Sequence, residues 1–468
     1  MNTAEKRNLF ERASMSEAVF RLALPTVIGQ IIMVIYNMSD TFFIGLTGDE
    51  AKVTALTICM PAFMLLSAVS NLFGIGGSSA VSRAMGSGDP DRARRSSALA
   101  LWGCVLFTGL YMALACINIH PYVELLGGGN TAVHSYAVQY ILITVVIGGL
   151  FTSVSALFSH LIRAEGCGFQ ASFGIALGGI LNIALDPLFM FVIMEPGQEV
   201  LGAGIATAIS NLISLVYFIF ILIKRRRSSV LSFRFSDVSV RDGVLTDLLS
   251  AGLPACIMTL CENVSYAVLD RLLSASGIMV QAGIGVAKKI NMLAHSIVRG
   301  MAQGMLPLIA YNYASGNYRR MRKAARTSTA ISVVCAAVCT ACSLIFSRAL
   351  IGIFLQEGSE AVDYGVKFLR ILCIGGPFSA CAYTCISFFQ AVGSGKKSFL
   401  LAIMRKGMLD IPLMTVLSGV YPVFGPVWAT PAADAACCCM SILLVARFFR
   451  AQQKQKSEKV CLKDIKVV

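Results

Sequence analysis

Acidic and amide side chains inside otherwise apolar stretches are the residues of this chain best suited to chemistry. Asp40 lies three positions after Asn37 in one such stretch, and Asn182 and Asp186 stand four positions apart in another. The second spacing projects both side chains from one face of a helix. A carboxylate in an apolar helix bundle is costly unless it is protonated, paired or bound to a cation. The pattern therefore predicts a site for a cation or a proton.

The oxygen donors expected to form this site are Asp40, Asn182, Asp186 and Thr207. They are hard ligands that suit Na⁺, and the two carboxyl groups can instead share one proton. They would hold a metal ion only if Na⁺ is the coupling ion. Two simpler interpretations remain open. Asp40 could be an acid at the outer end of its helix, because glycines follow at 45 and 48, or the four residues could form a static polar network.

A further acid, Glu262, falls near the middle of a later apolar stretch. A carboxylate there could attract organic cations or carry a second proton. The segment 366–392 contains no Asp or Glu that could act with it, so a second complete cation site is not expected. Amide, aromatic and methionine side chains on the apolar stretches of Asp40 and Glu262 are expected to line a substrate cavity together with Glu262: Gln30, Tyr36, Asn37, Met258 and Tyr266.

The elements that must position these residues are membrane-spanning helices. The 468-residue chain is 56% hydrophobic and 14% charged, with a mean hydropathy of +0.73, so lipid must solvate much of it. Runs such as 101–117 are apolar on every face, which indicates helices rather than the alternating strands of a barrel. Twelve spans are predicted: 17–45, 53–82, 97–118, 135–160, 171–194, 201–223, 247–273, 278–307, 328–354, 366–391, 398–420 and 424–446.

Basic residues predict the orientation of these spans. The net charge of +14 is spread over short clusters between apolar runs, which indicates topology signals rather than contacts to nucleic acid. The clusters fall in alternate loops, which places both termini in the cytoplasm. The predicted organisation is a cytoplasmic segment 1–16, a six-helix lobe 17–223, a cytoplasmic linker 224–246, a second six-helix lobe 247–446 and a basic cytoplasmic tail 447–468.

An internal repeat relates the two halves. LALPTVIG (22–29) matches SAGLPACI (250–257), LDPL (185–188) matches LDIPL (409–413), and three further matches follow the same order. Both halves start on the same side of the membrane, so the repeat predicts two six-helix bundles related by a pseudo-two-fold axis along the membrane normal, with a cavity between them. Pro25 and Pro254 occupy equivalent positions, where each is expected to kink its helix and allow bending.

The repeat also singles out charged residues in the second half. Asp410 aligns with Asp186, but Lys406 stands where Asn182 has its counterpart, so a local Lys406–Asp410 pair is predicted. Asp434 is expected to face the cavity. A charged stripe on the span 278–307 either lines the cavity or snorkels to the membrane surface: Lys288, Lys289, His295 and Arg299.

Several motifs together resemble the MATE (multidrug and toxic compound extrusion) family. They are the first span with Pro25, Gln30 and SDTFFIG (39–45), then RAMGSGD (83–89), NIALDP (182–187) and LGAGIATAISN (201–211). The likeness covers residues 15–447 and is strongest to the prokaryotic branch of the DNA-damage-inducible and staphylococcal multidrug members. It implies a twelve-helix transporter of organic cations with a cation site at the four positions named above.

The function expected from these features is secondary active multidrug efflux. Gly-rich segments such as GGSS (76–79) and GSGK (393–396) do not form a phosphate-binding loop, so ATP is not expected as the energy source and no enzyme site is predicted. The expected protein is a monomeric antiporter of the cell membrane that exchanges organic, often cationic, drugs for H⁺ or Na⁺, contacts membrane lipids, needs no cofactor and contributes to antibiotic resistance. The alternatives are a flippase for lipid-linked precursors and a non-transporting receptor or scaffold.

Overall fold

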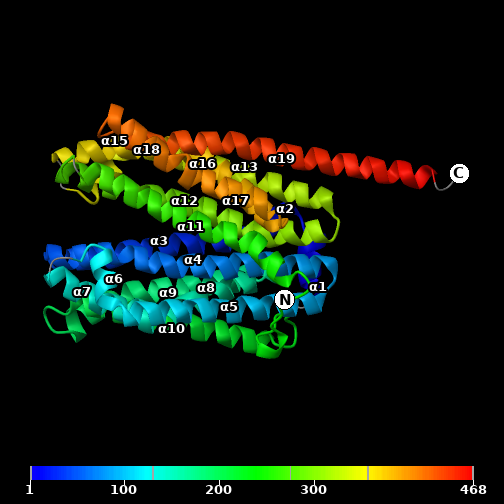
Figure 1. Cartoon of the computed structure of the whole chain (residues 1–468), viewed down its shortest axis with the longest axis horizontal. Helices are drawn as coiled ribbons and strands as arrows, with labels where there is room; N and C mark the ends of the chain where they lie inside the picture. The colour runs from blue at the N-terminus through cyan, green and yellow to red at the C-terminus, as the bar shows by residue number, and fades with distance from the viewer. Residues whose placement is uncertain (1–2, 129–130, 275, 356–357, 466–468) are drawn as a thin grey trace.

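The chain folds into two layers of long helices that lie side by side. The computed structural model describes residues 3–128, 131–274, 276–355 and 358–465, and every regular element in those ranges is helical. Figure 1 shows α3–α10 in one layer and α11–α19 in the other, with α3 and α4 facing α11 and α12. The predicted all-α membrane fold with two helical bundles is confirmed.

The first lobe begins with a short helix and then holds six spans. Its helices are α1 (Thr3–Glu11), α2 (Met15–Ala18), α3 (Leu24–Gly45), α4 (Glu50–Ser87), α5 (Pro90–Ile117), α6 (Ile119–Leu125), α7 (Thr131–Ile141), α8 (Gly149–Ala164), α9 (Gly168–Leu188) and α10 (Glu199–Arg225). Short π-helical segments occupy Val19–Ala23, Leu142–Ile147 and Phe189–Ile193. The first of these leads directly into α3, whose opening turn contains Pro25.

The second lobe follows a 3₁₀ turn at Phe235–Asp237. Its helices are α11 (Val244–Ser274), α12 (Ile278–Ala314), α13 (Tyr318–Ile345), α14 (Ser347–Gly352), α15 (Glu360–Ile374), α16 (Gly376–Ala391), α17 (Gly395–Ile403), α18 (Asp410–Val420) and α19 (Gly425–Ile465), with a π-helical segment at Met404–Met408. Pro254 lies inside α11. The span predicted to end at 307 continues to Ala314, because membrane helices tolerate a proline whose lost hydrogen bond is met by neighbours.

The spans agree with the predicted number. Within the described residues, eight helices are long and apolar enough to cross a membrane, and two bent pairs raise this to ten. The bends are 48° between Thr131–Ile147 and Gly149–Ala164, and 44° between Glu360–Ile374 and Gly376–Ala391. The two remaining predicted spans correspond to α12, whose charged stripe lowers its hydropathy, and to the α17–α18 segment.

The repeat seen in the sequence is visible in the helix caps. Gly88, with a φ of 76°, ends α4, and Asp89 caps α5 by accepting a hydrogen bond from the Arg92 backbone N–H. In the second lobe Gly316 has the same φ of 76°, and Asn317 caps α13 by accepting from the Arg320 N–H. A left-handed glycine followed by an Asx cap is a strong local signal for a helix–loop–helix connection.

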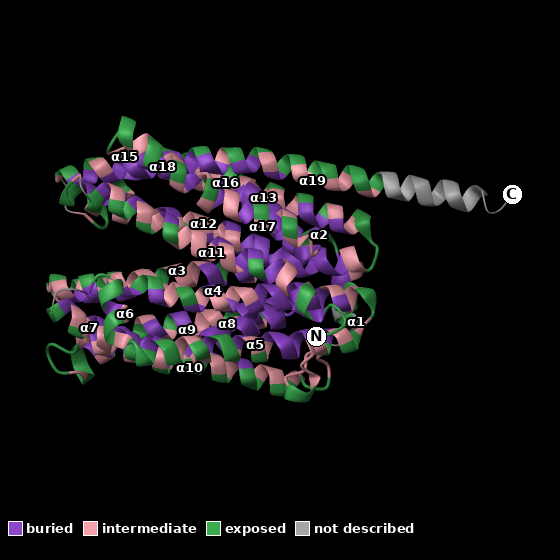
Figure 2. Cartoon of the chain, in the orientation of Figure 1, coloured by how far each residue is buried: buried purple, intermediate pink, exposed green. Residues whose placement is uncertain are grey.

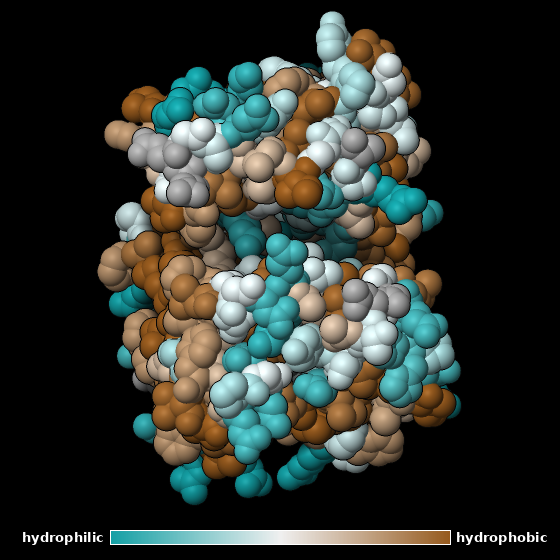
Figure 3. Space-filling model, turned by 90° about the vertical axis from the view of Figure 1, so that its left-hand side faces the viewer, coloured by the Kyte–Doolittle hydropathy of each residue, from teal (hydrophilic) through white to brown (hydrophobic). Residues whose placement is uncertain are grey.

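The two lobes touch closely at one end of the molecule and separate at the other. A Cβ atom at Gly252 of α11 would lie 1.9 Å from the Leu72 carbonyl oxygen of α4, so only glycine permits this approach of the two backbones. Figure 2 shows buried residues concentrated where the lobes meet near the chain termini. Viewed from the opposite end, Figure 3 shows a hollow between the lobes with hydrophilic residues inside it. The cleft therefore opens away from the termini.

The N-terminal helix α1 is part of the closed end. Phe10 is buried and its ring stacks on Tyr311 of α12, with the centroids 4.9 Å apart. Arg320 Nε donates to the Phe10 carbonyl oxygen at 2.6 Å, and Tyr311 Oη donates to Glu11 Oε1 at 2.8 Å. Burial opposes ionisation of Glu11, but this hydrogen bond and the Arg7 guanidinium hold its pKa below the usual value. Phe10 and Glu11 of this segment thus hold α1 against the second lobe.

Candidate functional site

The candidate cation site lies inside the first lobe, where α3, α9 and α10 meet. Small residues let these helices approach closely: Ser214 Oγ of α10 donates to the Gly174 carbonyl oxygen of α9 at 2.7 Å, and Gly179 of α9 packs on Ile32 of α3. This packing brings together the four residues predicted as ligands, Asp40 from α3, Asn182 and Asp186 from α9 and Thr207 from α10. All four side chains are buried.

Asn182 is the centre of the hydrogen bonding in this site. Its Nδ2 donates to Asp186 Oδ1 and to Thr207 Oγ1, both at 3.2 Å. Asn182 and Asp186 therefore lie on one face of α9 and contact each other, as their spacing in the sequence predicts. The carboxyl groups of Asp40 and Asp186 are close enough to interact directly, and Tyr36 lies beside them.

Three oxygen atoms of the site have no hydrogen-bond donor. They are buried and belong to separate residues: Asp40 Oδ1, Asn182 Oδ1 and Asp186 Oδ2. A static polar network would leave few such atoms, because an unsatisfied buried acceptor is destabilising. A sodium ion bound by these oxygens, or a proton shared by the carboxyl groups, would remove the deficit. These oxygens are the atoms that could hold such an ion or proton in the site expected from the sequence.

The other residues predicted to line a cavity are placed unevenly. Asn37 donates to the Met33 carbonyl oxygen at 2.7 Å along its own helix. Gln30 is buried, and Met258 belongs to the core cluster that joins the lobes, so the structure does not bring either side chain to the open surface. Tyr266 is partly exposed, and the Lys406 ammonium lies 5.8 Å from the centre of its ring.

Glu262 forms an ion pair with Arg299. Its Oε2 accepts a hydrogen bond from Arg299 Nη2 at 3.2 Å. The Glu262 side chain is 15% exposed and the Arg299 side chain is 32% exposed, so water can reach this ion pair. Arg299 is one of the charged residues on α12 for which a cavity role and snorkelling were both open. The structure favours the cavity for Arg299.

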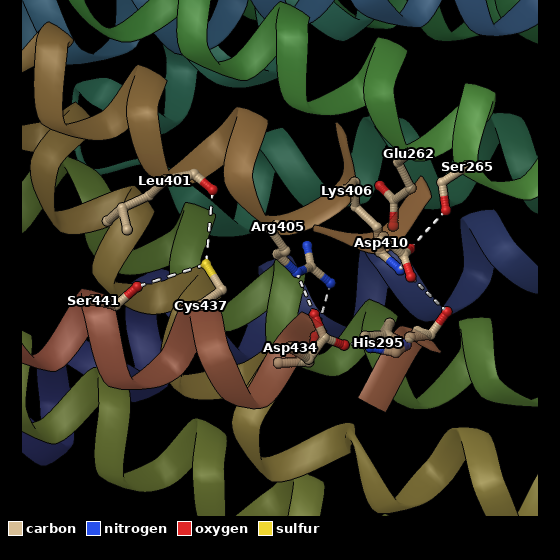
Figure 4. Close-up of polar contacts among 12 residues, drawn as sticks. Glu262, Ser265, His295, Leu401, Arg405, Lys406, Asp410, Asp434, Cys437 and Ser441 are labelled. Carbon is tan, nitrogen blue, oxygen red and sulfur yellow. Dashed lines mark hydrogen bonds and ion pairs between the residues drawn. The ribbon is translucent and has the colours of Figure 1, made fainter. Parts of the chain in front are cut away.

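A buried charge network of Arg405, Lys406, Asp410 and Asp434 lies near Glu262 (Figure 4). Arg405 Nε donates to Asp434 Oδ1 at 2.9 Å, and Arg405 Nη2 donates to Ser379 Oγ at 2.8 Å. Asp434 was expected to face the cavity, but it is buried, and Arg405 of the π-helical segment before α18 forms an ion pair with it. Arg405 was missed as a functional residue. An arginine inside an apolar span was itself the signal that could have found it.

The predicted Lys406–Asp410 pair is confirmed. Lys406 Nζ donates to Asp410 Oδ2 at 2.9 Å, and both side chains are buried. Asp410 also accepts from Ser265 Oγ at 2.7 Å and from Thr430 Oγ1 at 3.1 Å. One acid therefore joins α11, the α17–α18 segment and α19.

Comparisons with known proteins agree with this architecture. The chain is 26% identical over 442 residues to the Multidrug export protein MepA of Staphylococcus saprophyticus, which covers 94% of this chain and 96% of that protein. It is also 26% identical over 438 residues to MepA of Staphylococcus haemolyticus, covering 93% and 94%.

Solved structures share the fold. A crystal structure described as MATE in the straight conformation superposes with a TM-score of 0.88 at 21% identity, covering 97% of this chain and all of that one. An outward-facing multidrug resistance MATE family transporter of the MOP superfamily gives 0.87 at 22% identity, with the same coverage. The sequence model of the MatE family matches residues 25–188 and 254–416, one match in each lobe. With most of both lobes matched, this chain belongs to the MatE family.

Proposed function

We propose that this protein is a secondary active multidrug efflux antiporter that exports organic, often cationic, compounds in exchange for H⁺ or Na⁺. The observation that carries the proposal is the set of three donor-less oxygens on Asp40, Asn182 and Asp186 inside a membrane lobe. Membership of the MatE family and the likeness to relatives named for multidrug export support the choice of substrate.

The mechanism follows from the charge of the site and the shape of the cleft. Two buried carboxylates on neighbouring helices repel each other, and binding of a cation or proton removes that repulsion. Loading the site therefore favours tighter packing of α3 against α9, whereas release favours separation. Because α3 also packs on α12 of the other lobe, a movement of α3 can be transmitted to the interface that closes the cleft.

Transport in reconstituted vesicles tests the proposal. Ethidium should move against its own gradient when a proton or Na⁺ gradient is imposed in the opposite direction, and the movement should stop when an ionophore collapses that gradient. Failure of both gradients to drive ethidium or any other organic cation would refute ion-coupled efflux.

The flippase alternative gains no support from three basic residues of the second lobe. An anionic lipid headgroup would need basic side chains with free charge, but Arg299, Arg405 and Lys406 each pair with a carboxylate. The proposal includes a monomer that works in the cell membrane, contacts lipids and uses neither ATP nor nucleic acid.

Both chain termini are proposed to lie in the cytoplasm, with the cleft opening outward. A cysteine introduced at Ser359 should then react with a membrane-impermeant maleimide added outside cells, whereas one at Ser228 should react only after the membrane is opened. Mass spectrometry of the labelled peptides separates these sites from the native cysteines. Reaction of both from the same side would show that the orientation is misassigned.

Glu262→Gln is expected to weaken efflux of cationic substrates severalfold more than efflux of neutral ones. The change leaves the Arg299 guanidinium without its carboxylate at a water-accessible position, which repels a cation but not a neutral molecule. Transport of ethidium and of a neutral dye by the same vesicles gives the ratio. Glu50→Gln, at an exposed helix start, is the control. An equal loss for both substrates would assign Glu262 a structural role instead.

A further inference from the structure

The second lobe contains a counterpart of the candidate cation site. Lys406 and Asp410 have the same spacing as Asn182 and Asp186, within segments that the repeat aligns. Thr430 follows in the aligned pair LGAGIAT (201–207) and FGPVWAT (424–430), opposite Thr207. Three positions of the first-lobe site therefore have counterparts in the second lobe, on equivalent helices.

Both sets join the same two helices, through the amide in the first lobe and through the acid in the second. In the first lobe Asn182 aligns with Lys406. It links Asp186 on its own helix to Thr207 on the next helix in the chain. In the second lobe Asp410 accepts a hydrogen bond from Lys406 Nζ at 2.9 Å (Figure 4). It also accepts one from Thr430 Oγ1 at 3.1 Å, which again links the two helices. The acid and the threonine are retained at their aligned positions, while the amide is replaced by an ammonium group.

The two sets differ in charge and in satisfaction of their oxygens. The first-lobe set holds two carboxylates, neither of which forms an ion pair with another described residue, and three of its buried oxygens lack a donor. In the second lobe, alignment of Pro25 with Pro254 puts Leu269 opposite Asp40, so one carboxylate remains and one lysine balances it. No buried polar atom of Lys406, Asp410, Ser265 or Thr430 in the described structure lacks a partner.

We propose that the Lys406 ammonium is a tethered cation that occupies, in the second lobe, the place of the coupling ion in the first. This rests on the proposed function of the first-lobe site. An ammonium group and a bound Na⁺ both supply one positive charge to surrounding oxygens, but the ammonium cannot leave. The second-lobe site is thus permanently loaded, and Asp410 holds α11, α18 and α19 together throughout the transport cycle. Only the first lobe then exchanges ions.

Replacement of Lys406 by a neutral residue should create a new cation site in the second lobe. In a background of Asp40→Asn with Asp186→Asn, purified protein should lose the rise in melting temperature that Na⁺ or acidification causes in the wild type. Adding Lys406→Asn gives the second lobe the residue found in the first and leaves Asp410 free to bind a cation, so the response should return. Adding Lys406→Arg instead keeps the charge tethered, so no response should return.

The outcomes separate the two proposals. If the Asp40→Asn, Asp186→Asn background responds to cations like the wild type, the first-lobe site is wrong. Suppose instead that the melting temperature of that background does not respond to cations. If the folded triple variant with Lys406→Asn then responds no more than the one with Lys406→Arg, the tethered-cation proposal is overturned. If the triple variant does not fold, Asn182→Lys decides. A lysine brought into the first lobe should raise the cation concentration for half-maximal response at least tenfold, and an unchanged value would overturn the proposal.

Discussion

Asp40→Asn should reduce gradient-driven efflux at least tenfold, to the level of vesicles without protein, while the variant remains folded and still binds substrate. The amide keeps the size of the side chain and part of its hydrogen bonding, but it neither exchanges a proton nor binds Na⁺ as a carboxylate does. Coupling should therefore fail before structure does. Vesicles with matched protein content and the same imposed gradient give the efflux rate, and ligand-induced thermal shift gives the binding.

Two further variants make this prediction sharper. Asp186→Asn should behave like Asp40→Asn, and the double variant should be little worse than either, because the two carboxyl groups serve one site. Glu17→Gln is the matched control, since this acid lies on the same span but forms only an exposed pair with Arg21 at 3.1 Å. Efflux by Asp40→Asn at the wild-type rate would rule out the first-lobe cation site.

The spacing of residues within one helix predicted local geometry well. Asn182 with Asp186, and Lys406 with Asp410, stand four positions apart, and both pairs are in contact in the structure. A helix fixes which side chains share a face, so such contacts follow from the chain itself. The repeat extended this reasoning between the lobes, because duplicated segments carry the same caps and the same order of helices.

Contacts between side chains of different helices could not be predicted from the sequence. The lack of an acid in 366–392 argued against a second complete cation site, but the sequence did not show that Glu262 pairs with a base, Arg299, on the next helix. Asp434 was expected at the cavity, and only the packing of α19 against the π-helical segment before α18 shows that Arg405 covers it. Register between helices depends on side-chain packing, which periodicity does not specify.

Contacts of the N-terminal segment also could not be predicted from residue types. Residues 1–16 were expected simply as a polar cytoplasmic extension, because they precede the first apolar run. In the structure the backbone carbonyl of Phe10 accepts hydrogen bonds from Asn312 and Arg320, and its ring is buried against α12. Backbone carbonyls carry no sequence signal, so a contact made through them is not predictable from residue types.

Arg405→Met should lower the free energy of unfolding by about 3–5 kcal/mol, the range for removing one partner of a buried ion pair. The guanidinium is buried and binds both Asp434 and Ser379, so its loss leaves the Asp434 carboxylate in an apolar bundle without its ion-pair partner. Unfolding of purified protein in mixed micelles with increasing SDS measures the change. Arg348→Met is the control, because its pair with Asp363 is exposed and should contribute about 1 kcal/mol or less.

The double variant Arg405→Met with Asp434→Leu separates the two causes of this loss. If the cost comes from the uncompensated carboxylate, then replacing that carboxylate with an apolar side chain of similar volume should restore most of the stability. If the cost comes from lost packing of the arginine against Tyr383, whose ring centre lies 5.6 Å from the guanidinium carbon, the double variant should remain as unstable as Arg405→Met. If Arg405→Met alone is as stable as the wild type, Asp434 must find another partner. The stability of the second lobe would then not depend on the Arg405–Asp434 pair.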